Sequence, residues 1–260
     1  MRIDANGIAF NCRIDGPEGA PWLAFSNSLA TNLSMWDAQV TELRKSYRIL
    51  RYDQRGHGGT QASAGRYDFE LLVADVVALF DALSIERAHC VGISMGGVTA
   101  LLLAERHPER VDRLVPCDCG AASTPASAQQ WEERIAIAGK EGMEPLVDAT
   151  ARRWFPPEFV AAHPAVFDRV RDMIRTTPVK GFTGCAAALS NYDLRPGLGR
   201  IERPTLLIAG ARDATVPAMR QIHAAIAGSR LVELEGAGHL SNLEAPEAFT
   251  RELQGFLAAG

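Results

Sequence analysis

The segment Gly92-Ile-Ser-Met-Gly96 contains the residue with the clearest setting for catalysis, because it reads Gly-x-Ser-x-Gly. Residues 88–91 before it are apolar and predict a strand, and residues 98–106 after it predict a helix. A serine on so tight a turn needs neighbours without Cβ atoms, which the two glycines provide. The helix N-terminus beside Ser94 also favours a nearby negative charge. A serine that only caps the helix is the alternative, but the strand–turn–helix context favours a nucleophile.

A serine hydroxyl becomes a nucleophile when a neighbouring base removes its proton. His239 is the predicted base, because it lies between glycine and leucine in a loop directly after the last predicted strand. The remaining histidines fall in a turn, within a strand or on helices and at their ends, where structural roles explain them better: His57, His89, His107, His163 and His223.

An acid must then hold the histidine in the correct tautomer. Asp213 is the leading candidate, since it follows the buried run at residues 204–210 and precedes a loop closed by Pro217. Asp118 also lies after a predicted strand and also fits the chain order serine, acid, histidine. Asp53 precedes the serine and breaks that order. Either of the first two aspartates has a simpler alternative as a turn or helix-cap residue.

Two N–H donors are needed to stabilise the negative charge of a tetrahedral intermediate. The amide of Met95, immediately after the nucleophile, is one expected donor. The second should come from the loop after the strand at residues 22–26, where Leu29 is the natural candidate with Ser28 beside it. A plain connecting loop is the alternative for Leu29.

Strand-like and helix-like runs alternate along most of the chain, which predicts an α/β fold with a mostly parallel sheet. An Asn6-Gly7 turn predicts a hairpin at the start. Residues 123–196 are helix-like and interrupted by prolines, so we expect a helical cap inserted into a core of residues 1–122 and 197–260. Such a cap would cover the carboxyl ends of the strands, where open α/β sheets bind ligands.

Composition excludes several classes of protein. The net charge of −4 gives no electrostatic reason to expect nucleic-acid or membrane binding, and the apolar runs are too short to span a bilayer. The N-terminal residues lack the apolar core of a signal peptide.

Five cysteines in mostly apolar runs indicate buried thiols in a reducing, cytoplasmic compartment. The spacing of Cys117 and Cys119 is wrong for paired zinc ligands, so we expect no metal. The sequence does not decide between a monomer and a homo-oligomer.

With these residues in place, the chain resembles the α/β-hydrolases over its whole length, and within them the 3-oxoadipate enol-lactonases of aromatic-compound degradation. The Asn27-Ser28 pair, where most α/β-hydrolases have His-Gly, and the cap motifs carry the closer resemblance. The matching stretches are residues 26–29, 34–37, 52–58, 92–97, 131–135, 153–155 and 239–249. Asp118 is a departure, because an uncharged Asn-Thr-like pair is expected after that strand.

The resemblance implies an eight-stranded sheet with helices on both faces, no cofactor, and a small acidic lactone as substrate. Ser94 would attack the ring carbonyl of the enol-lactone, and water activated by His239 would release 3-oxoadipate. A general carboxylesterase or a carbon–carbon bond hydrolase would use the same three residues with another cap pocket. Perhydrolysis is a possible side reaction, and a non-enzymatic ligand-binding protein of this fold is a distant alternative.

An acidic substrate needs a cation in its pocket, because burying an unpaired charge costs several kcal/mol. We expect Arg134 to bind the carboxylate, because Trp131 lies three residues earlier on the same helix face. Trp131 and Trp154 are the expected pocket walls, and Ser28 is expected to contact substrate. The other cap arginines are better explained as solvated helix faces: Arg152, Arg153, Arg169, Arg171, Arg175 and Arg195.

Overall fold

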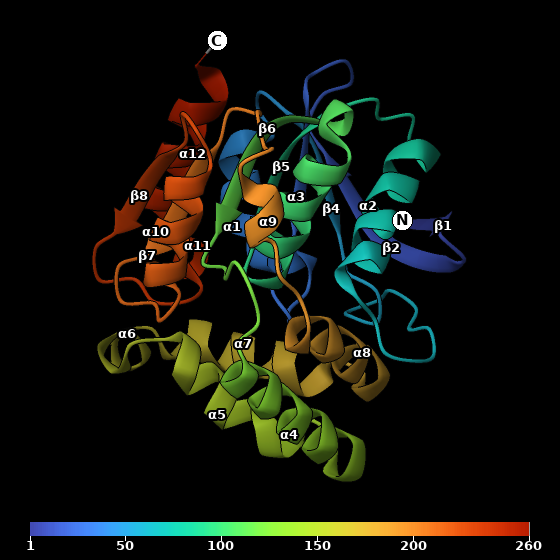
Figure 1. Ribbon diagram of the computed structural model, residues 1–260, viewed down its shortest axis with the longest axis vertical. Coiled ribbons are helices and arrows are strands. Elements are labelled where there is room, and N and C mark those ends of the chain that lie inside the picture. Colours follow the sequence, from blue (N-terminus) through green and yellow to red (C-terminus); the bar gives the residue numbers. More distant parts are fainter. Residues whose placement is uncertain (260) are drawn as a thin grey trace.

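The computed structural model describes residues 1–259, which are built around one twisted sheet (Figure 1). The described residues form eight strands in the order β1-β2-β4-β3-β5-β6-β7-β8. All pairs from β4 to β8 are parallel, and β1 and β2 supply an antiparallel edge. The strands are β1 (Arg2–Ala5), β2 (Ile8–Asp15), β3 (Trp22–Ser26), β4 (Arg48–Tyr52), β5 (Ala88–Ile93), β6 (Val111–Cys117), β7 (Leu206–Gly210) and β8 (Arg230–Leu234).

The edge hairpin forms where the sequence predicts it. Asn6 and Gly7 have positive φ angles of 44° and 77°, the backbone that a two-residue hairpin turn with this twist requires. Strands β5 and β7 are buried at every residue, which explains why they read as continuous apolar runs and not as alternating patterns.

Helices cover both faces of the sheet (Figure 1). Helix α2 packs on α3, α10 packs on β7 and β8, and α1 packs against α12. The helices of this core are α1 (Asp37–Leu43), α2 (Phe69–Ala82), α3 (Met95–Arg106), α9 (Arg195–Leu198), α10 (Val216–Ala225), α11 (Ser241–Glu244) and α12 (Pro246–Ala258), with short 3-10 turns η1 (Leu33–Trp36) and η2 (Pro108–Arg110).

Five further helices come between β6 and β7 in the chain and gather at one end of the sheet (Figure 1). They are α4 (Pro125–Glu141), α5 (Glu144–Trp154), α6 (Pro157–Ala162), α7 (Pro164–Thr176) and α8 (Val179–Ser190). Prolines stand in the first turn of α4, α5, α6 and α7, where a missing N–H costs nothing. The division into a core and a cap at residues 123 and 196 stays a prediction.

A 3-10 turn that the sequence did not predict comes before helix α1. The sequence indicates a helix from Trp36 to Lys45, but the chain first makes the 3-10 turn η1, and α1 begins at Asp37. The Asn32 side chain accepts a hydrogen bond from the Ser34 N–H and so starts this earlier turn.

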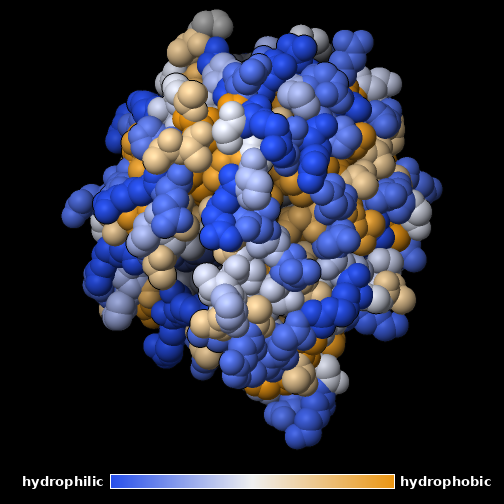
Figure 2. All heavy atoms as spheres, in the orientation of Figure 1, coloured by the Kyte–Doolittle hydropathy of each residue, from blue (hydrophilic) through white to orange (hydrophobic). Residues whose placement is uncertain are grey.

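On the face shown in Figure 2, hydrophilic residues cover much of the surface and apolar residues appear in smaller areas between them. Within residues 1–259, none of the helices is both long and apolar enough to cross a membrane.

Candidate active site

Ser94 lies on the turn between β5 and α3 with φ 55° and ψ −116°, a strained backbone for a residue with a side chain. The two flanking glycines are required by close backbone contacts. A Cβ on Gly92 would lie 2.1 Å from the Gly96 carbonyl oxygen, and a Cβ on Gly96 would lie 2.2 Å from the carbonyl oxygen of Ser26 in β3. The Gly-x-Ser-x-Gly pattern is therefore explained by the packing of α3 against the sheet.

Ser94, His239 and Asp213 form a continuous hydrogen-bonded chain. The Ser94 Oγ lies 2.9 Å from His239 Nε2, and His239 Nδ1 lies 2.9 Å from Asp213 Oδ2. Thr215 Oγ1 also donates to Asp213 Oδ2. Three segments far apart in sequence, after β5, β7 and β8, thus bring together the predicted nucleophile, acid and base.

The electrostatics of this chain suit proton transfer. Burial lowers the pKa of His239, but attraction and a hydrogen bond to Asp213 outweigh burial and raise that pKa above its ordinary value of 6.5. Burial opposes the ionisation of Asp213, but attraction to His239 and hydrogen bonds from His239 and Thr215 lower the pKa of the carboxyl overall. Asp213 therefore stays ionised and stabilises a protonated His239.

Asp118, the alternative acid, is completely buried but is not bonded to His239. It accepts hydrogen bonds from the Gly210 N–H at 2.7 Å and from the Ser241 Oγ at 2.5 Å. Burial, reinforced by the nearby charge of Asp213, raises the pKa of Asp118 to about 8. The carboxyl ties the end of β6 to the end of β7 and the start of α11, which is a structural role.

The two candidate oxyanion donors are the N–H groups of Met95, which follows Ser94 in the chain, and of Leu29. Met95 is the first residue of α3, where an N–H has no partner within the helix. Leu29 lines the same cavity as Ser94 and His239. The structure does not support the predicted contact between Ser28 and substrate. Ser28 is fully buried and is not among the described residues that line this cavity. Its carbonyl accepts from Thr31, which closes a turn that directs Leu29 and not Ser28 to the cavity.

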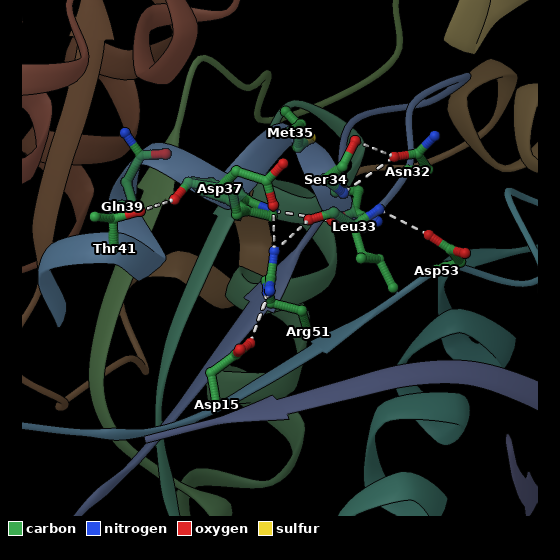
Figure 3. Close-up of polar contacts among 12 residues, drawn as sticks. Asp15, Asn32, Leu33, Ser34, Met35, Asp37, Gln39, Thr41, Arg51 and Asp53 are labelled. Carbon is green, nitrogen blue, oxygen red and sulfur yellow. Dashed lines mark hydrogen bonds and ion pairs between the residues drawn. The ribbon is translucent and has the colours of Figure 1, made fainter. Parts of the chain in front are cut away.

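The 3-10 turn η1, which follows the loop that carries Leu29, is held by charged side chains of β4 and of the turn after β4 (Figure 3). Asp53 Oδ1 accepts a hydrogen bond from the Leu33 N–H at 2.7 Å. Arg51 pairs with Asp15 at 2.7 Å and with Asp37 at 2.6 Å, and joins β2, β4 and the start of α1 (Figure 3). Asp53 therefore supports η1 and does not assist the base.

A cavity of about 370 Å³ opens above Ser94, between the strand ends and helices α4, α5 and α8. Trp131 and Trp154 line it as predicted, and the Trp154 ring stacks on His239 with centroids 6.0 Å apart. The cavity walls are mostly apolar. The two arginines among the lining residues come from helices α4 and α5. The full lining comprises Leu29, Ser94, Val98, Asp118, Cys119, Gly120, Ala122, Ser127, Gln130, Trp131, Arg134, Arg153, Trp154, Leu189, Tyr192, Asp213, Ala214, Thr215 and His239.

Arg134 lines this cavity, and no acidic residue of the described chain pairs with it. Its Nη2 donates to Thr150 Oγ1 at 2.5 Å, and its guanidinium lies 4.6 Å from the Trp131 ring centroid. The buried Nη1 has no hydrogen-bond partner among the described residues. Burial and repulsion from Arg153 lower the pKa of Arg134 to about 9, so the group is still a cation at pH 7. A desolvated cation with an unused donor is poised to bind an anion.

Arg153 is exposed, as the predicted solvated helix face requires, but it also lines the cavity, which the sequence did not predict. Its guanidinium lies 5.8 Å from the Trp131 ring centroid. The signal that could have identified it is its position next to Trp154, a predicted wall residue. Other cap arginines form ion pairs with acids and are explained as surface residues: Arg169, Arg171, Arg175 and Arg195. Arg152 lies over the ring of Phe167 and is not among the lining residues.

The other polar candidates have structural explanations. His57 is fully buried, and its Nδ1 lies 3.1 Å from the Arg55 carbonyl within the same turn. The five cysteines are buried and free. Within residues 1–259 there is no cluster of three or more His, Cys, Asp or Glu residues that could hold a metal ion.

Comparison with known proteins gives consistent matches. Residues 21–246 match the family model described as alpha/beta hydrolase fold. The chain is 37% identical to 3-oxoadipate enol-lactonase 2 of Acinetobacter baylyi, over 97% of this chain and 94% of that protein. It is 32% identical to a putative carbamate hydrolase of Pseudomonas syringae, over 92% of this chain and 94% of that protein. The crystal structure of the enol-lactonase from Burkholderia xenovorans superposes with a TM-score of 0.96 at 41% identity and covers 100% of both chains.

Proposed function

The chain belongs to the α/β-hydrolase fold family, and we propose that it opens the lactone ring of 3-oxoadipate enol-lactone to give 3-oxoadipate. The observation that carries the substrate assignment is the pair of cations in the cavity above Ser94. Arg134 and Arg153 line this cavity, and no salt bridge between either of them and an acid is found among the described residues. Arg153 is attracted by the charge of Asp213, and a substrate carboxylate would supply the counter-charge that Arg134 lacks among the described residues.

In the first step, Ser94 Oγ attacks the ring carbonyl while His239 Nε2 accepts the serine proton. The carbonyl oxygen becomes an oxyanion, and its proposed donors are the N–H groups of Met95 and Leu29. Asp213 holds the imidazole in the tautomer that leaves Nε2 free to accept, and its negative charge stabilises the imidazolium that forms.

Collapse of the tetrahedral intermediate breaks the bond between the carbonyl carbon and the ring oxygen. The ring oxygen leaves as an enolate that stays attached to the acyl chain, and His239 returns its proton to this leaving group. Tautomerisation of the enol gives the ketone. The acyl-enzyme then carries the whole substrate as a chain esterified to Ser94.

Hydrolysis of this ester completes the reaction. His239 removes a proton from water, the resulting hydroxide attacks the ester carbonyl, and Ser94 leaves with the proton that His239 gives back. The product has two carboxylates and a ketone. Every proton and electron pair in these steps is accounted for by the substrate, water and the three linked side chains.

The cavity offers complementary contacts to the rest of the substrate. The Trp131 face packs against the Arg134 guanidinium and leaves an apolar wall for a small ring. The planar guanidinium can donate two parallel hydrogen bonds to a carboxylate. The arrangement therefore suits a small ring that bears one charged arm.

A matched pair of substrates tests the proposal. The first is the carboxymethyl enol-lactone, and the second is the same ring with a methyl group in place of the carboxymethyl. We expect kcat/KM to be about 30- to 3,000-fold higher for the first, since a buried charge pair is worth about 2–5 kcal/mol. Equal values for both lactones would contradict the acidic substrate. Faster turnover of a carbamate would assign the chain to the reaction named for its carbamate-hydrolase relatives, and faster turnover of neutral esters would indicate a general carboxylesterase.

We also propose that the enzyme works in a reducing, cytoplasmic setting. The support for this proposal is that its five cysteines are free and buried.

A further inference from the structure

The loop that presents His239 is held in place by hydrogen bonds to its backbone. This loop, residues 235–240, connects β8 to α11 and includes Gly236 at φ 75°. Glycine adds backbone freedom, so a loop with two glycines beside a catalytic base needs an independent means of fixing its position.

Three consecutive N–H groups around His239 are each held by a hydrogen bond. The Gly238 N–H donates to Glu244 Oε2 at 2.8 Å, and the Leu240 N–H donates to Glu244 Oε1 at 3.1 Å. The His239 N–H between them donates to the Trp154 carbonyl at 2.8 Å. The two oxygens of one carboxylate thus hold the residues on both sides of the base.

Close packing makes this arrangement intolerant of movement. A Cβ on Gly238 would lie 2.6 Å from the Trp154 carbonyl oxygen, and a Cβ on Gly210 would lie 2.0 Å from the Gly238 carbonyl oxygen. The loop backbone is therefore confined between the end of α5 and the end of β7. The hydrogen bonds from Gly238 and Leu240 to Glu244 hold it further.

We propose that Glu244 is a positioning residue for catalysis. It holds the His239 backbone so that Nε2 stays within hydrogen-bond distance of the Ser94 hydroxyl. The ionised carboxylate accepts more strongly from both amides than a protonated carboxyl, because hydrogen bonds to a charged acceptor are stronger and protonation makes one oxygen a donor. Burial raises the pKa of Glu244 to about 7, whereas the two amide hydrogen bonds and the charge of His239 favour its ionised form. The same negative charge supports the imidazolium that forms during each proton transfer.

The test uses two substitutions at Glu244 and one matched control. Glu244→Gln keeps one acceptor oxygen but turns an NH₂ group toward the second amide, and Glu244→Ala removes both acceptors. Glu247→Gln is the control, since Glu247 is an exposed glutamate three residues further along the chain. Turnover of p-nitrophenyl acetate serves as the assay, so that the outcome does not depend on the natural substrate.

A misplacement of about 1 Å in a catalytic group costs up to about 100-fold in rate. We therefore expect kcat to fall about 10-fold in Glu244→Gln and about 100-fold in Glu244→Ala, with KM within about twofold of the wild-type value. The rate at which a fluorophosphonate labels Ser94 should fall in the same order, because that reaction also needs His239. Glu247→Gln should match the wild type in both measurements.

Thermal unfolding separates positioning from stability. Assays are made well below the Tm of each variant, so that every molecule is folded. If kcat and the labelling rate of folded Glu244→Gln and Glu244→Ala equal those of the wild type while Tm falls, Glu244 is only structural and the proposal is overturned. An increase in KM with unchanged kcat would overturn it too, because that result places Glu244 in substrate binding.

Discussion

Replacing Arg134 by alanine tests how the cavity selects its substrate. The guanidinium uses one nitrogen on Thr150 and one face on Trp131, which leaves the buried Nη1 without a partner among the described residues. We propose that this free edge binds the substrate carboxylate. In Arg134→Ala, that carboxylate would enter a mostly apolar cavity and lose one of two cations.

Loss of a buried, hydrogen-bonded charge pair costs about 2–5 kcal/mol, or about 30- to 3,000-fold in kcat/KM. Arg134 is half-buried and Arg153 remains in the variant, so the expected loss for the carboxylated enol-lactone lies at about 30- to 300-fold. The neutral methyl-substituted lactone should lose less than about threefold. Most of the loss should appear in KM, because the carboxylate lies away from the reacting carbonyl.

The assay measures kcat and KM for both lactones with the wild type, Arg134→Ala and Arg175→Ala. Arg175 is the matched control, since it is a cap arginine that pairs with Glu144 and Asp172. Equal losses on both lactones would mean that Arg134 is structural. Unchanged kcat/KM for both lactones would refute the proposal that Arg134 binds the substrate carboxylate. Since Arg134 has no counter-ion within residues 1–259, Arg134→Met should leave Tm unchanged or raise it while it weakens binding.

Three further predictions concern the catalytic chain. Ser94→Ala should lower kcat by about 10⁶-fold without loss of folding, measured by initial rates and circular dichroism, and retention of a tenth of the activity would contradict a covalent mechanism. Asp213→Asn should lower kcat by about 10⁴-fold and Asp118→Asn far less; the reverse order of losses would make Asp118 the acid. Because His239 must be neutral to accept a proton, kcat/KM should rise with pH through a pKa above 6.5. Asp213→Asn removes the attraction that raises the pKa of His239, so the rise of kcat/KM should move to lower pH. If the rise stays at the same pH in this variant, the titrating group is not His239.

Much of the framework could be predicted because it depends on local patterns. The alternation of buried strands with amphipathic helices indicates a parallel sheet, and the glycines around Ser94 indicate a strand-to-helix turn. The eight-stranded fold and the membership of the α/β-hydrolase fold family are confirmed. Helix α1 lies within one residue of its predicted start, but the 3-10 turn η1 before it was not predicted, because it depends on hydrogen bonds of Asn32 and Asp53 that helix periodicity does not encode.

The chemistry of the cavity was less predictable because it depends on contacts between distant segments. Arg153 and Arg171 look alike in sequence, and only the fold shows that Arg171 pairs with Asp148 while Arg153 faces the cavity. Ser28 and Leu29 are neighbours, and which of them faces the cavity depends on the hydrogen bonds of the turn. Glu244 lies five residues after His239, and its role depends on how a short helix returns its carboxylate to the loop.

The most direct test of the proposed reaction is the mass of the acyl-enzyme. The leaving enolate stays attached to the acyl chain when the ring opens. The mass of the protein should therefore increase by the full mass of the enol-lactone. Rapid acid quenching of the wild type with excess enol-lactone, followed by intact-protein and peptide mass spectrometry, should show this full-mass adduct on Ser94 and none in Ser94→Ala. An adduct on another residue, or rapid conversion to 3-oxoadipate by Ser94→Ala, would contradict the account.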